Sequence, residues 1–168
     1  MKNTKLKRGL LLPFLSLLLL LNSCNLLENN ETESLSITGT WVDAYGGKIE
    51  VTEDLYSSYW SNNGTLTLSH KGEIVSFTNN SLNGGESENI TGGYGYLVIK
   101  YDTENGGAGS GKYGILRWNS LTTISNETTM SYSEGFNDSV YFDTEEDAIS
   151  GMTNASGYFN FYSSTTKE

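Results

Sequence analysis

The chain of 168 residues carries 20 acidic and 10 basic side chains, which gives a formal net charge of −10 at pH 7. This length is enough for one domain with a hydrophobic core of its own. The acidity argues against nucleic acid as a partner, because phosphates need basic patches, and the single cysteine excludes an internal disulfide.

The first element in chain order is an export signal. Four of the first eight residues are basic, no acidic residue precedes Glu28, and residues 10–21 are nearly all leucine. A helix of that length reaches roughly 18 Å, too short for a bilayer core of about 30 Å. We expect residues 1–23 to be a signal peptide, although a short buried helix or an uncleaved anchor is the alternative. Its removal takes four basic residues and no acidic ones, so the net charge becomes −14.

The signal ends in Leu21-Asn22-Ser23-Cys24, which resembles the lipobox of bacterial lipoproteins. The resemblance implies a diacylglyceryl group on the Cys24 thiol, cleavage before Cys24 and a fatty acid such as palmitate on the new amino terminus. Two or more acyl chains anchor a protein stably where one does not. We therefore predict Cys24 as a lipid attachment site in the bacterial cell envelope. Because Asn25 is not the aspartate associated with inner-membrane retention, the outer membrane or the cell surface is favoured.

Residues 24–36 are polar and acidic, and we expect a lipidated tether there, followed by a folded domain over residues 37–168. That domain has short runs of alternating apolar residues broken by turn residues, a pattern that predicts antiparallel strands. In the run 94–101, Tyr94, Tyr96 and Val98 share one face while Leu97, Ile99 and Tyr101 share the other. The runs are KIEV, TLTLS, EIVSF, YGYLVIKY, KYGILRW, TMSY, SVYF and YFNFY, the last within an expected final strand over residues 157–163.

Glycines mark the expected turns. Gly46-Gly47 suits a tight hairpin, and His-Lys-Gly at 70–72 is predicted to join two alternating runs, so that His70 is a turn residue. Residues 102–111 are expected to form a hairpin loop. A calcium site on Asp102, Glu104 and Asn105 is the alternative, but Tyr113 stands where an EF-hand loop needs glutamate. No metal and no cofactor are expected.

One helix is predicted before the last strand. Thr144 can cap it, the following three residues are acidic, and Gly151 would end it after about two turns. Eight or nine sequential strands with short connections, plus this helix, predict an all-β fold, an antiparallel up-and-down β-barrel.

Gly39-Thr40-Trp41 at the first strand resembles the Gly-x-Trp motif of lipocalin and calycin barrels. The resemblance implies a tryptophan across the closed end of the barrel and a cation from a late strand stacked on it, and we expect Arg117 to be this cation. The segments ITGTWVDAYGGKIEVT, GYLVIKYD, GKYGILRW and SGYFNFYSS together resemble small lipocalin-like lipoproteins of host-associated spirochaetes.

The expected activity is binding without catalysis. With Cys24 lipidated and His70 the single histidine, neither a Cys–His nor a Ser–His arrangement is expected. The barrel would hold a small apolar ligand, or it would be filled and bind a protein partner through its outer face or loops. Aromatic residues suit either contact, and the candidates are Tyr56, Tyr59, Trp60, Tyr94, Tyr96 and Trp118.

Overall fold

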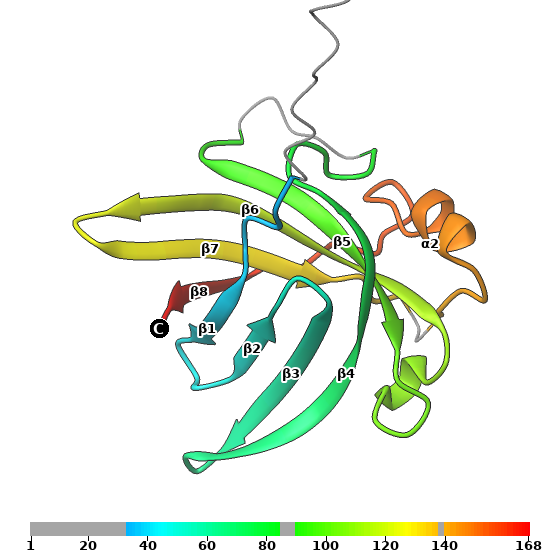
Figure 1. Cartoon of the computed structure of the whole chain (residues 1–168), viewed down its shortest axis with the longest axis horizontal. Helices are drawn as coiled ribbons and strands as arrows, with labels where there is room; N and C mark the ends of the chain where they lie inside the picture. The colour runs from blue at the N-terminus through cyan, green and yellow to red at the C-terminus, as the bar shows by residue number, and fades with distance from the viewer. Residues whose placement is uncertain (1–32, 85–89, 138–139) are drawn as a thin grey trace, which may run out of the picture. The chain divides into compact units, whose positions relative to one another are not determined.

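The structure is a computed structural model that describes residues 33–84, 90–137 and 140–168. Eight antiparallel strands pair in chain order, and β1 also pairs with β8, so the sheet closes into a barrel (Figure 1). The predicted barrel with one short helix before its last strand is thus confirmed. No helix in the described part of the chain is long and apolar enough to cross a membrane. The elements are β1 (Gly39–Asp43), β2 (Lys48–Val51), β3 (Leu55–Asn62), β4 (Thr65–Thr78), β5 (Gly93–Tyr101), the 3-10 turn η1 (Gly107–Gly109), β6 (Tyr113–Ile124), β7 (Glu127–Glu134), α2 (Glu145–Gly151) and β8 (Ser163–Lys167).

Side chains of the protein itself occupy the barrel interior. Alternate residues of each strand point inward. Most of these are buried, and Trp41, Tyr56 and Trp118 have no exposed surface. A side chain bordering an internal space large enough for water would keep exposed surface, so no such space touches these three. The cluster comprises Leu35, Ile37, Trp41, Ile49, Val51, Tyr56, Ile74, Leu97, Ile99, Tyr101, Leu116, Trp118 and Met130.

A second apolar cluster lies outside the barrel, between the sheet and the segment that leads to β8. Val98 of β5 and Ile115 of β6 point outward, as the alternation predicts, and Ala148 of α2 packs against them. The helix is capped as predicted, because the Thr144 side chain accepts a hydrogen bond from the Asp147 backbone N–H. The other members of the cluster are Met152, Tyr158 and Phe159.

Trp41 is a buried residue of β1 that holds the segment leading into the barrel. Its indole Nε1–H donates a hydrogen bond of 2.8 Å to the Ile37 carbonyl. Lys167, the neighbour of Trp41 on β8, places its Nζ 5.6 Å from the centre of the ring. Gly39 has a φ of +133°, and a Cβ there would lie 2.4 Å from Lys167 Cε. The glycine of the Gly-x-Trp motif therefore leaves room for the lysine that crosses to the tryptophan.

Arg117 is not the cation on Trp41, so this sequence prediction is wrong. Arg117 lies on β6 between Leu116 and Trp118, which both point into the barrel, and its own side chain consequently points outward. Its Cζ lies 4.4 Å from the ring centre of Phe159. The strand alternation that buries Trp118 thus puts Arg117 on the opposite face of the sheet from Trp41.

The predicted turn at residues 70–72 is also wrong, because β4 runs through it. The chain reverses instead at Asn63-Gly64, where φ is 52° and 79°. Gly72 is paired with Tyr56 inside the sheet, and a Cβ there would lie 2.5 Å from the Lys100 carbonyl oxygen. The glycine permits close strand packing, and the alternating runs on either side of it belong to one strand.

Two strands expected near the C-terminus differ from the structure. The last strand is Ser163–Lys167, which begins directly after the aromatic run instead of covering residues 157–163, because Tyr158 and Phe159 pack into the outer cluster instead of pairing. In the described part of the SVYF run, only Phe142 pairs, through a single bridge to Tyr113.

Candidate functional site

One end of the barrel gathers polar and aromatic side chains. Because successive strands alternate in direction, the connections β1–β2, β3–β4, β5–β6 and β7–β8 all lie at this end, which we call the mouth. In Figure 1 the β3–β4 hairpin and the β5–β6 loop with η1 mark it at the bottom of the view. The last inward-pointing residues of β5 and β7 meet inward-pointing residues of β3 and β4 there.

Glu134 is the centre of this group. It follows Met130 and Tyr132 in the inward phase of β7, and its side chain is 23% exposed. The Tyr56 hydroxyl donates a hydrogen bond to Glu134 Oε1, and His70 Nε2 lies 2.5 Å from Glu134 Oε2. One carboxylate of β7 therefore binds donors from β3 and β4 across the barrel.

Aromatic rings pack around the histidine. The His70 ring centre lies 5.9 Å from that of Tyr56 and 5.4 Å from that of Tyr101, and the Tyr101 ring lies 5.4 Å from Tyr141. These contacts fix the plane of the imidazole. We call Tyr56, His70, Tyr101, Glu134 and Tyr141 the Glu134 cluster.

The electrostatics of the cluster follow from burial and from one negative charge. Burial lowers the pKa of His70, but the hydrogen bond and the charge of Glu134 outweigh it, so the pKa is raised above its ordinary value. Burial, followed by the charge of Glu134, raises the pKa of the Tyr56 and Tyr101 hydroxyls well above the usual range. The tyrosines thus remain neutral donors, and the carboxylate favours a protonated histidine.

His70 also has a serine partner, contrary to the sequence expectation. The Oγ atom of the exposed Ser69 lies 3.0 Å from His70 Nδ1. Both ring nitrogens of the single histidine are therefore engaged, one by a hydroxyl and one by a carboxylate.

The β5–β6 loop lies against this histidine. The backbone N–H of Lys71 donates to the Asn105 carbonyl at 2.8 Å, and a Cβ at Gly107 would lie 3.4 Å from His70 Cβ. The Asp102 carboxylate accepts the backbone N–H groups of Glu104 and Asn105 at 2.8 and 2.9 Å, which lowers its pKa. Asp102 thus stabilises a turn, as the hairpin-loop interpretation of 102–111 expects.

The predicted contact residues are dispersed, and only Tyr56 belongs to the Glu134 cluster. Tyr59 lies on the outer face, where its hydroxyl donates to Glu50 at 3.0 Å and Lys48 lies over its ring. Trp118 is buried inside the barrel, and Trp60 is 51% exposed near the end of β3. Tyr94 and Tyr96 are half-buried on β5, and Tyr96 packs against the outer cluster.

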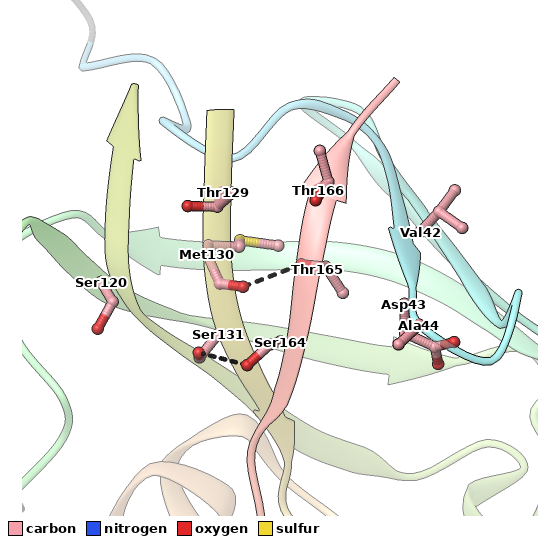
Figure 2. Close-up of a pocket in the computed structure, with 10 residues that line it drawn as sticks. All are labelled: Val42, Asp43, Ala44, Ser120, Thr129, Met130, Ser131, Ser164, Thr165 and Thr166. Atoms are coloured by element: carbon pink, nitrogen blue, oxygen red, sulfur yellow. Dashed lines mark hydrogen bonds between the residues drawn. The ribbon is translucent and has the colours of Figure 1, made fainter. Parts of the chain in front are cut away.

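A hollow of about 620 Å³ lies along β7, β8 and β1 (Figure 2). Its floor includes the buried Met130 and Thr165, which are joined by a 3.1 Å hydrogen bond from the threonine hydroxyl to the methionine carbonyl. Hydroxyl side chains dominate the remaining lining, and Asp43 is its one charged residue. Because it brings together no pair of titratable groups, this hollow offers less chemistry than the Glu134 cluster. Its lining is Val42, Asp43, Ala44, Ser120, Thr129, Met130, Ser131, Ser164, Thr165 and Thr166.

We predict that His70 makes stability depend on pH. A raised folded-state pKa contributes stability that is fully present below the unfolded value of about 6.5 and is lost as pH rises through the folded value. We therefore expect the free energy of unfolding of the native protein to exceed that of His70→Gln at low pH, and this difference to shrink as the pH rises. Urea unfolding at pH 5.5, 7 and 8.5 measures it. Other titrating groups are shared by both proteins, so parallel pH profiles would contradict the assignment.

Comparison with protein-family models, with curated proteins and with solved structures finds no match to this chain. Cys24, the predicted lipid attachment site, lies outside the residues that the structure describes. The geometry of the mouth and the sequence pattern of the N-terminus are therefore the basis for a functional proposal.

Proposed function

We propose that this protein is a lipid-anchored lipoprotein of the bacterial cell envelope that binds a protein partner through the mouth of its barrel. Cys24 would carry the lipid, and residues 25–36 would tether the barrel to the membrane. The observation that carries the choice of partner is the packed interior. The side chains of Trp41, Tyr56 and Trp118 have no exposed surface, and they occupy the volume that an internal ligand would need.

The alternative is a carrier for a small apolar ligand. An eight-stranded barrel is just wide enough either to be filled by side chains or to hold one small ligand. Two tryptophans and two tyrosines lie in this interior cluster, together with branched aliphatic residues. This packing favours contact at the rim over storage inside the barrel.

Exposed aromatic residues lie on the connections that form the mouth. Tyr45 belongs to the β1–β2 turn, Trp60 lies near the β3–β4 turn, and Phe136 and Phe161 lie at either end of the β7–β8 connection. Phe136 and Phe161 line one hollow of about 260 Å³ that Glu134 also borders. Exposed aromatic side chains next to a small hollow are typical of protein interfaces. The acidity of the chain favours a partner with a neutral or basic surface.

We expect a photo-crosslinking residue at position 161 to capture a defined protein in the intact envelope. Ile124 is the matched control, because it is also exposed but lies at the β6–β7 turn, at the opposite end of the barrel. The full-length chain with the crosslinker at 161 should yield one protein adduct that the chain with the crosslinker at 124 lacks. Cys24→Ser should abolish that adduct by releasing the chain from the membrane.

The mass of the adduct separates the two functions. A protein-sized increase at position 161 alone supports the proposal. An increase of a few hundred daltons would favour a small ligand, and equal adducts at positions 161 and 124 would contradict a binding site at the mouth.

A further inference from the structure

A β-bulge positions Ser69 beside His70. Along the β3–β4 pair, Ser58 is paired with His70 and Tyr59 with Leu68, so that Ser69 is an extra residue without a partner. Consecutive side chains of a regular strand point to opposite faces, whereas a bulge breaks the alternation and can redirect a side chain. The result is the 3.0 Å distance between Ser69 Oγ and His70 Nδ1.

The hydrogen bonds of Glu134 determine which histidine nitrogen is a base. An ionised carboxylate only accepts hydrogen bonds, so the 2.5 Å contact to His70 Nε2 requires the hydrogen on that nitrogen. In the neutral imidazole, Nδ1 then carries the lone pair. The Ser69 hydroxyl can therefore donate its hydrogen to Nδ1, the arrangement that activates a serine nucleophile.

The surroundings keep the base oriented and the nucleophile accessible. Tyr56 and Tyr101 pack on the imidazole of His70, and the His70 side chain is only 19% exposed. The Tyr56 hydroxyl also donates a hydrogen bond to the Glu134 carboxylate. Ser69 is exposed to solvent. Nucleophile, base and orienting carboxylate thus form one chain of contacts, in which the serine is the most exposed member.

We propose that Ser69, His70 and Glu134 form a nucleophilic relay that hydrolyses small uncharged esters at the barrel mouth. Ser69 Oγ would attack the ester carbonyl carbon while its proton passes to His70 Nδ1, and the alcohol leaves with that proton when its C–O bond breaks. Water then attacks the acyl group on Ser69 and gives one proton to Nδ1. That proton returns to Ser69 Oγ as the carboxylic acid departs.

Charge determines the roles and the substrate class. Glu134 stabilises the imidazolium that forms in each step, because its oxygen lies 2.5 Å from Nε2. The net charge of −10 disfavours anionic esters. This activity goes beyond the proposed binding role and departs from the sequence expectation of a non-catalytic domain.

The test uses the full-length chain with p-nitrophenyl acetate as substrate and a fluorophosphonate as covalent probe. We expect the probe to modify Ser69, located by peptide mass spectrometry, and Ser69→Ala to lower the hydrolysis rate about a hundredfold. His70→Gln should lower it similarly. It should also abolish the rise of the rate with pH that accompanies loss of the His70 proton.

Ser164→Ala is the matched control, because the Ser164 hydroxyl lies near another serine, Ser131, at 3.5 Å. This variant should keep the native rate and pH profile. Circular dichroism and thermal unfolding of Ser69→Ala should be native, since its side chain is exposed. Probe modification distributed over other serines, or a Ser69→Ala variant with the native rate, would overturn the relay.

Discussion

Replacing Trp41 with alanine is expected to lower the free energy of unfolding by about 3–5 kcal/mol, the usual cost of removing a large buried aromatic side chain. Trp41 is fully buried in the interior cluster, and it holds the entering segment through the 2.8 Å hydrogen bond to the Ile37 carbonyl. Its loss leaves a cavity and also a buried carbonyl without its donor. Because the free energy of unfolding of a small domain is only about 5–15 kcal/mol in total, the variant should unfold at a much lower denaturant concentration.

Chemical denaturation measures this effect, and two controls separate its parts. Trp41→Phe keeps most of the apolar volume but loses the indole N–H, so we expect a loss of about 1–3 kcal/mol. Lys167→Ala removes only the cation 5.6 Å from the ring and should lose less than about 1 kcal/mol. An unfolding midpoint of Trp41→Ala close to the native one would refute the view that Trp41 anchors the segment that enters the barrel.

The strand pattern was predictable because it is local. Tyr96 and Val98 were expected on one face of β5 and Leu97, Ile99 and Tyr101 on the other, and the structure divides them between the outer and inner clusters in this way. The helix was predictable for the same reason, since a capping threonine and three acidic residues are adjacent in sequence.

One error in the strands came from a glycine. Gly72 looks like a turn residue, but it lies within β4. Glycine is needed there because a larger residue would clash with the Lys100 backbone. Whether a glycine marks a turn or a close approach depends on the neighbouring strand, which the local sequence does not contain. The face of Arg117, by contrast, follows from Trp118 beside it in the sequence, because neighbouring residues of a strand point to opposite faces.

The Glu134 cluster was missed because its members are distant in sequence. His70 and Glu134 are separated by 64 positions, and Tyr56 and Glu134 by 78. One signal was present: Glu134 follows Met130 and Tyr132 at a spacing of two, so a charged residue occupies the inward phase of a strand. Such a residue needs a buried partner, and the single histidine was a candidate.

Replacing Glu134 with alanine is the second large effect that we expect, a loss of about 2–4 kcal/mol. The Tyr56 hydroxyl is buried and would lose its acceptor, and His70 would lose the carboxylate 2.5 Å from Nε2. Each unsatisfied buried donor costs about 1–3 kcal/mol. The partial exposure of Glu134 lets water replace some of these contacts, so the sum stays below that for a fully buried ion pair. Urea unfolding at pH 7 measures this loss.

A general loss of packing would also lower stability, so the decisive measurement is the pKa of His70. The chain contains one histidine, which gives one set of imidazole signals in an NMR titration. In the native protein Glu134 raises this pKa against the opposing effect of burial. In Glu134→Ala only burial remains, and the pKa should fall below its ordinary value. Glu134→Gln, which keeps the shape but not the charge, should also lower the pKa while it retains more of the stability. If the pKa of His70 were the same in all three proteins, Glu134 would not be the group that controls the charge at the mouth.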